Sequence, residues 1–148
     1  MDIQEGSGWR LALDPARDPF GALIGGERWA VELQARELRA LRHGVLRLLA
    51  QHRQLRSSLM AEEQIELELD LPLLGPAAPG AAAGSLFVAL LGDRHRWSLR
   101  FVLTPAPGGR AVEGAWSPEA SVALAAALER LPLPGGGDGP WAGSGEGL

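Results

Sequence analysis

The sequence of 148 residues lacks four residue types: cysteine, lysine, tyrosine and asparagine. Without cysteine the chain has no disulfide, no thiolate metal ligand and no cysteine nucleophile. Without lysine it has no Schiff base and no phosphate-binding lysine of the P-loop kind. All 14 basic residues are therefore arginine. Because lysine, tyrosine and asparagine have AT-rich codons, we attribute these absences to a GC-rich genome rather than to selected chemistry.

Long hydrophobic runs are also absent. No segment approaches the roughly 18 apolar residues that a membrane-spanning helix needs. The apolar run at residues 86–91 has the length of a buried strand. Residues 1–5 are acidic where a secretory signal would be basic, and no apolar stretch follows them. We therefore expect a cytoplasmic protein that does not span a membrane.

The charges are sorted along the chain rather than mixed. The chain has the length of one domain, and its net charge is −4. Residues 35–61 contain six arginines and Glu37, a net charge of +5, and residues 62–72 contain five acids and no base, a net charge of −5. A basic block followed at once by an acidic block indicates surfaces of opposite sign.

Hydrophobic periodicity predicts six strands and two helices. Apolar residues alternate with polar ones, as in half-buried strands, at 9–13, 29–33, 64–71 and 97–103. The continuous apolar run at 86–91 and a short segment at 112–116 complete the six strands. Spacings of three and four predict a helix at about 35–61. Ser117 followed by Pro118 begins a second helix that runs to about 131. The order β-β-α-β-β-β-β-α predicts an α+β fold, with one long and one short helix packed on an antiparallel sheet of about six strands.

Composition predicts one folded domain at residues 8–131. Residues 1–7 are expected to form a flexible N-terminus. Residues 75–84, rich in alanine, glycine and proline, are expected to form a low-complexity loop within the domain. Residues 132–148 are rich in glycine and are expected to form a disordered tail.

A set of short segments carries a family resemblance. They are Gly8-Trp9-Arg10-Leu11, Asp14-Pro15, Gly25-Gly26-Glu27, Trp29-Ala30-Val31-Glu32-Leu33, Met60-Ala61-Glu62-Glu63, Trp97-Ser98-Leu99-Arg100-Phe101 and Glu113-Gly114-Ala115-Trp116. In these segments, spread over about residues 6–131, the chain resembles the cyanobacterial family known as domain of unknown function 1818. The resemblance implies a fold similar to that of single-stranded-DNA-binding regulators of the whirly and PUR-alpha type, which build helix-swapped dimers from units of four strands and a helix. It implies no activity and no catalytic residues.

Charged side chains mark the candidate interaction surface. The strand at 64–71 presents Glu66, Glu68 and Asp70 on one face, roughly 6.5–7 Å apart. Such a row can serve acid–base chemistry or hold a cation, but it is more often a solvated outer face. Arg100, on a nearby strand, is expected to pair with one of them. The predicted surface also includes Trp116 and the helix arginines Arg36, Arg39, Arg42, Arg47, Arg53 and Arg56, which can contact phosphates or an acidic strand.

The remaining polar and aromatic residues suggest no catalytic, cofactor or metal site. His43 is expected on the polar side of the long helix, His52 on its apolar seam as a hydrogen-bonded core or interface residue, and His95 in a charged turn. They share no metal-binding spacing. Trp9, Trp29 and Trp97 are in phase with leucine and valine, so the core is their expected place.

These observations favour a non-enzymatic protein that acts as an interaction or regulatory module on a protein partner. The long apolar seam must be covered by the sheet or by a second chain, so a homodimer is a further expectation. A single-stranded nucleic-acid-binding regulator is the alternative by fold analogy, but the net charge disfavours it. A carboxylate-based enzyme ranks third.

Overall fold

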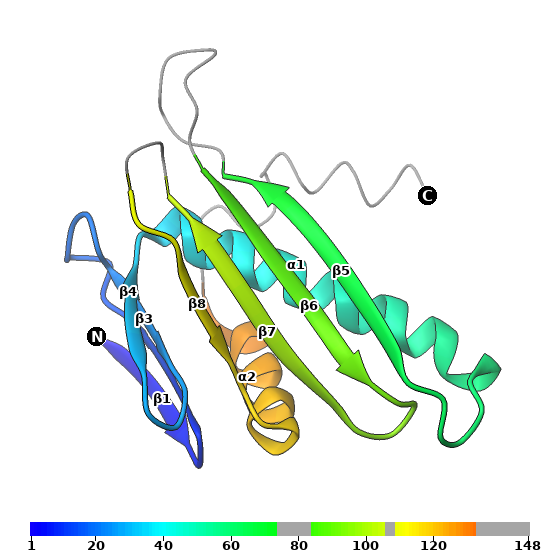
Figure 1. Cartoon of the computed structure of the whole chain (residues 1–148). Coiled ribbons are helices and arrows are strands. Elements are labelled where there is room, and N and C mark those ends of the chain that lie inside the picture. Colours follow the sequence, from blue (N-terminus) through cyan, green and yellow to red (C-terminus); the bar gives the residue numbers. More distant parts are fainter. Residues whose placement is uncertain (74–83, 106–108, 133–148) are drawn as a thin grey trace.

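The computed structural model describes residues 1–73, 84–105 and 109–132 (Figure 1). Within these residues four strands are followed by a long helix, and then a second set of four strands is followed by a second helix. The α+β class is therefore confirmed. The predicted loop at 75–84, apart from Gly84, and the predicted tail at 132–148, apart from Pro132, lie outside the described residues.

The first sheet is antiparallel, and its strands pair in chain order. They are β1 (Asp2–Gly6), β2 (Trp9–Leu13), β3 (Ala22–Gly25) and β4 (Ala30–Leu33). Leu11 and Leu13 are buried between more exposed neighbours, which gives β2 one face toward the core. Gly8 connects β1 to β2 with a φ of 79°, a conformation that side-chain-bearing residues rarely adopt.

The prediction of one sheet of about six strands is corrected to eight strands in two sheets among the described residues. Sequence analysis misses β1, which lies in the segment expected to be flexible, and β3. Four of the five residues of β1 are exposed, and three of the four residues of β3 are buried, so neither strand alternates. Both are held by pairing to β2, a contact that periodicity along the chain does not report.

The second sheet is also antiparallel and pairs in chain order. It contains β5 (Ile65–Pro72), β6 (Ser85–Gly92), β7 (Trp97–Thr104) and β8 (Val112–Ala115). On β6, Leu86, Val88 and Leu90 are buried toward the helices. Figure 1 shows both helices behind this sheet, and no described element covers its other side. The second sheet therefore has one covered face and one open face.

The long helix, α1 (Ala35–Leu55), begins with a capping box in which Gln34 and Glu37 satisfy each other's backbone N–H groups. Its apolar seam is buried against β5 and β6, so the protein's own sheet covers it. The helix ends earlier than the predicted residue 61 and continues as a 3-10 turn, η1 (Arg56–Ser58). Ser57 and Ser58 are poor helix formers because their hydroxyls compete for backbone hydrogen bonds.

The second helix, α2 (Pro118–Arg130), confirms its predicted start and comes within a residue of its predicted end. Ser117 is the N-cap, and its Oγ accepts the backbone N–H of Ala120 at 3.2 Å. Pro118 occupies the first turn, where a proline loses no hydrogen bond. The helix packs on both β7 and β2, so it bridges the two sheets.

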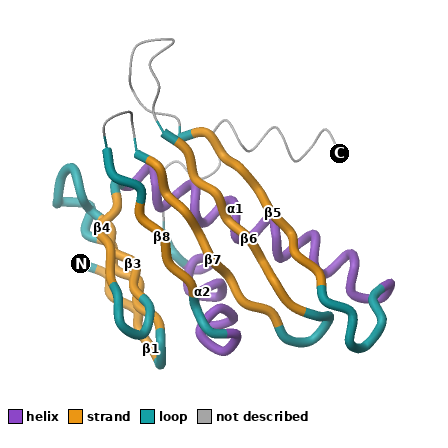
Figure 2. The backbone as a smooth tube through the Cα atoms, viewed as in Figure 1, coloured by secondary structure: helices purple, strands orange, loops and turns teal. Residues whose placement is uncertain are grey.

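The two sheets share one hydrophobic core and meet at an aromatic cluster. The rings of Trp29, Phe101 and Trp116 lie 5.2–5.7 Å apart, centroid to centroid. Trp9, Trp29 and Trp97 are partly buried and pack against the core, which agrees with their predicted placement. Figure 2 shows β8 beside the first sheet at this junction.

Candidate functional site

The predicted acidic row lies on the open face of the second sheet. Glu66, Glu68 and Asp70 are exposed, and they alternate with Leu67 and Leu69, which are partly buried toward the core. The row is therefore a solvated face rather than a buried carboxylate cluster. This arrangement leaves the carboxylates accessible to a partner.

Arg100 reaches across the sheet to this row, as predicted. Its guanidinium nitrogen donates to Glu66 Oε1 at 2.7 Å, from β7 over β6 to β5. On the way its guanidinium carbon lies 5.1 Å from the centre of the Phe87 ring, within cation–π range. Because both charged side chains of the pair are well exposed, the ion pair contributes at most about 1 kcal/mol to stability.

Apolar side chains share the open face with the charged ones. The pairing register places Phe87, Leu91 and Val102 on the same side as the acidic row. Leu91 is 46% exposed, while Phe87 and Val102 are partly buried. We call the side chains on this side of the sheet the open face. Its members are Glu66, Glu68, Asp70, Pro72, Ser85, Phe87, Ala89, Leu91, Ser98, Arg100, Val102, Thr104, Glu113 and Ala115.

The six helix arginines do not form one surface. Near the start of α1, Arg36 donates to Gln34 Oε1 at 2.8 Å, and Arg42 donates to the Glu129 carbonyl at 3.2 Å. Arg39 and Arg47 are partly buried along the helix. Only the last two of the predicted set, Arg53 and Arg56, are exposed, at the opposite end of the helix.

Arg53 and Arg56 help to form a basic pocket that sequence analysis does not predict. An open pocket of about 360 Å³ is lined by Arg53, Arg56, Ser57, Arg94 and His95. Arg53 lies in the last turn of α1, Arg56 and Ser57 lie in η1, and the last two residues lie in the turn between β6 and β7. We call this the arginine pocket. The two parts are about forty residues apart in sequence, and buried His52 joins them in the fold, since its Nε2 donates to the Asp93 carbonyl at 2.9 Å.

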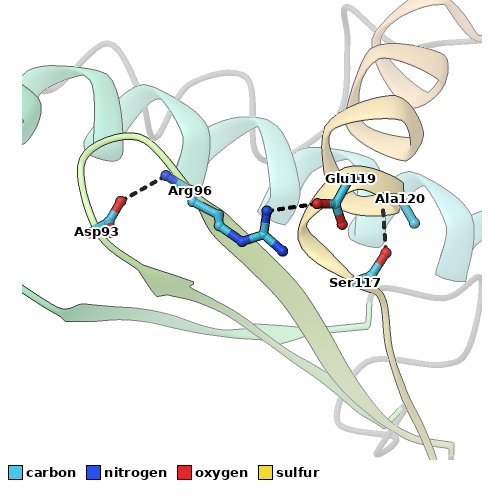
Figure 3. Close-up of polar contacts among 5 residues, drawn as sticks. All are labelled: Asp93, Arg96, Ser117, Glu119 and Ala120. Carbon is cyan, nitrogen blue, oxygen red and sulfur yellow. Dashed lines mark hydrogen bonds and ion pairs between the residues drawn. The ribbon is translucent and has the colours of Figure 1, made fainter.

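The turn beside the pocket is held by a carboxylate. The backbone N–H groups of His95 and Arg96 both donate to Asp93 Oδ1 at 2.8 Å. These donors, with that of Arg96 the stronger, lower the pKa of Asp93 from its ordinary value of 3.8. Arg96 also donates to Glu119 Oε1 at 2.7 Å, which joins the turn to the start of α2 (Figure 3).

The histidines occupy different surroundings. His52 is buried, hydrogen-bonded to the Asp93 carbonyl and 6.1 Å from the Trp97 ring, as its predicted core position requires. His43 is partly buried, and burial, assisted by the charge of Arg47, lowers its pKa from 6.5. In the part of the chain that the structure describes, no three histidine or acidic side chains gather at metal-binding distance.

Trp116 is wrongly placed by sequence analysis. It is only 4% exposed, and its indole N–H donates to the Gly25 carbonyl at 2.9 Å, across the junction between the sheets. Its ring packs against Trp29 and Phe101. Trp116 is therefore a core residue and leaves the candidate interaction surface.

Comparison with known proteins places the chain in a family. The family model described as a domain of unknown function, DUF1818, matches residues 4–131. The chain belongs to this family. Membership in DUF1818 agrees with the resemblance seen in the sequence, and the match spans both sheets and both helices. No curated protein matches the chain.

A solved structure supports the fold of this DUF1818 protein. It is a crystal structure of a protein of unknown function, described as a DUF155-family member, from the cyanobacterium Prochlorococcus sp. NATL2A. The two chains are 34% identical, the match covers 87% of this chain and 97% of the other, and the TM-score is 0.72. Among the described residues, no helix has the length and apolar character needed to span a membrane.

Proposed function

We propose that this DUF1818 protein is a non-enzymatic interaction module that binds a basic protein partner through the open face. The observation that carries the proposal is an uncovered sheet face on which apolar side chains lie among carboxylates. Exposed Leu91 and the neighbouring Phe87 offer contact area, and the acidic row offers charge. Interfaces combine an apolar centre with a polar rim in this way.

The charge of the open face selects the kind of partner. The described strands place four carboxylates there, Glu66, Glu68, Asp70 and Glu113, against the single guanidinium of Arg100, a net charge of −3. Two copies meeting face to face would bring like charges together, which disfavours association. A partner with arginine or lysine around an apolar patch would be attracted instead.

The exposure of the acidic row supports the non-enzymatic part of the proposal. General acid–base catalysis by a carboxylate is favoured by burial, which raises its pKa toward neutrality. Glu66, Glu68 and Asp70 face solvent, and Glu66 is paired with Arg100. The row is better suited to attracting a charged surface than to moving protons.

Single-stranded nucleic-acid binding is the second candidate. The repeated unit of four antiparallel strands and a helix supports the comparison with regulators of the whirly and PUR-alpha type. The charge of the open face opposes this candidate, because affinity for nucleic acid comes largely from neutralising phosphates. Trp116 is buried, so it offers no platform on which a base could stack.

The test is affinity capture from a cyanobacterial lysate with charge-reversed variants. We expect wild type to retain a basic protein that Glu68→Arg/Asp70→Arg does not retain. The matched control, Glu27→Arg/Glu129→Arg, reverses two exposed carboxylates on a turn and on α2, away from the open face. It should retain the same protein. Retention by all three proteins, or by none, would contradict the proposal.

A companion measurement separates the two candidates. Fluorescence anisotropy with labelled single-stranded DNA and RNA, at low and moderate salt, should show no binding to the wild type. Salt-sensitive binding would instead favour the nucleic-acid candidate. Sedimentation at several concentrations should show a monomer, whereas a dimer that is lost in the Glu68→Arg/Asp70→Arg variant would assign the open face to self-association.

A further inference from the structure

We infer that the arginine pocket binds a phosphate monoester carried by a small molecule. Its described lining comprises three guanidinium groups, one imidazole and one hydroxyl, with no carboxylate among them. Guanidinium groups bind phosphate oxygens through paired, charge-assisted hydrogen bonds. A site of this composition matches a dianionic phosphoryl group. The inference does not rest on the open face, which belongs to other residues of the molecule.

The arginines of the pocket are available for a ligand. Arg53 and Arg56 make no ion pair within the described residues, whereas Arg10, Arg17, Arg96 and Arg100 each have a carboxylate partner. Arg94 makes no ion pair among the described residues either, and its Nη1 donates to the Leu59 carbonyl at 3.3 Å. The pocket therefore concentrates unneutralised positive charge in a protein whose net charge is −4.

The turn that supplies Arg94 and His95 is preorganised. Asp93 fixes the backbone with two hydrogen bonds at 2.8 Å, and buried His52 holds the Asp93 carbonyl from the helix. Arg94 Nε donates to His95 Nε2 at 3.1 Å, which orients both side chains. A binding group held in place before the ligand arrives loses less entropy on binding.

The end of α1 does not cancel the pocket's charge. A helix C-terminus carries a partial charge of about −0.5. The three guanidinium groups that line the pocket outweigh it several times over. The partial negative charge at this end of the helix also stabilises the positive charge of Arg53 in the last turn.

The shape of the charge distribution favours a small ligand over a nucleic acid. A nucleic acid needs a track of cations that follows its backbone. The other α1 arginines do not extend the pocket into such a track, because Arg42 turns to the Glu129 carbonyl and Arg39 is partly buried. The open pocket has a volume of about 360 Å³, which lies within the range of small-molecule sites.

Titration calorimetry on the full chain tests the inference. The probes are inorganic phosphate, glycerol phosphate as a simple monoester, and a 5′-phosphorylated oligothymidine, each at matched ionic strength. We expect glycerol phosphate to bind and the variant Arg53→Gln/Arg56→Gln to bind it about tenfold more weakly or not at all. Glutamine keeps the helix propensity of arginine, and melting curves establish that the variant folds.

The control variant Arg28→Gln/Arg110→Gln removes the same two charges from exposed positions outside the pocket. It should bind glycerol phosphate as tightly as wild type. Equal weakening in both variants would reduce the effect to net charge and overturn the inference, and so would no binding of glycerol phosphate to wild type. If the oligothymidine binds about tenfold more tightly than glycerol phosphate, the ligand of the pocket is a nucleic acid and the inference of a small molecule is overturned.

Discussion

Gly44 lies inside α1, where glycine ordinarily costs a helix about 1 kcal/mol relative to alanine. The structure gives the reason for this glycine, because a Cβ on Gly44 would lie 2.8 Å from Val88 Cγ2 and 3.0 Å from Leu71 Cδ1. The missing side chain lets the helix approach β5 and β6. Val88 is β-branched and cannot turn away freely.

The substitution Gly44→Ala should therefore destabilise the protein, against the propensity rule. We expect the free energy of unfolding to fall by about 1 kcal/mol, since overpacking exceeds the helix gain. Urea denaturation measures the change. In a Val88→Ala background the clash is relieved, and the same substitution should be neutral or stabilising. Stabilisation of the wild-type background by Gly44→Ala would show that the helix is free to shift.

Among single residues, the site was partly predictable. Strand alternation predicts that Arg100 pairs with one of the three acids of the row, and the structure forms the pair with Glu66. The prediction that Trp116 lies on the interaction surface is wrong. Its position at the end of a short strand does not determine which face it occupies, and only its hydrogen bond to the Gly25 carbonyl of the other sheet shows where it points. Arg53 and Arg94 are joined by tertiary packing alone, so no local pattern predicts their pocket.

At the scale of elements, the hairpin of β6 and β7 depends on a short turn closed by a side chain. Asp93 accepts two backbone hydrogen bonds, and these lower its pKa because they favour the charged carboxylate. This turn also positions Arg94 and His95 in the arginine pocket and Arg96 beside α2. A local motif of four residues therefore sets the geometry of two neighbouring regions.

The stability of this turn should depend on pH. A lowered folded-state pKa means that Asp93 contributes stability above its unfolded value of 3.8, and that this contribution is lost as the pH falls through the folded pKa. Asp93→Asn should therefore be less stable than wild type at neutral pH, with a difference that shrinks below pH 3.8. Denaturation across this range measures it. A difference for Asp93→Asn that stays constant across this range would contradict the assignment.

Elements with a local cause were predictable and elements without one were not. The N-cap Ser117 and the proline after it place the start of α2, and alternation places β5 and β7. By contrast, β1 has no apolar pattern and exists because β2 offers a pairing partner. A strand that forms because a neighbouring strand pairs with it, and that has no apolar alternation of its own, cannot be predicted from the sequence pattern.

At the scale of the whole molecule, two tryptophans join the sheets reciprocally. The Trp116 indole donates to the Gly25 carbonyl of β3, and the Trp29 indole donates to the Ala115 carbonyl of β8 at 3.3 Å. Gly114 makes room for the Trp29 ring, which a Cβ at that position would meet at 2.6 Å. Side chains, rather than a backbone ladder, connect the two sheets here, which explains why one continuous sheet was the wrong expectation.

Removing one tryptophan should weaken both sheets together. Trp116→Ala should lower the free energy of unfolding by about 3–5 kcal/mol. The milder Trp116→Phe keeps most of the packing and should cost about 1 kcal/mol through the lost donor. Urea denaturation followed by circular dichroism should show a single transition in each case. A cost for Trp116→Ala below about 0.5 kcal/mol, typical of surface positions, would contradict its place in the core.

The position of β5 gives the acidic row a second consequence. In the described sheet order β5 is an outermost strand, with one side of its backbone unpaired. Such an edge can template growth into fibrils by adding the same strand from another molecule, at a spacing of about 4.8 Å. Stacking identical strands would set each carboxylate of Glu66, Glu68 and Asp70 against its own copy. The row that we propose attracts a basic partner should thus also oppose polymerisation of the protein on itself.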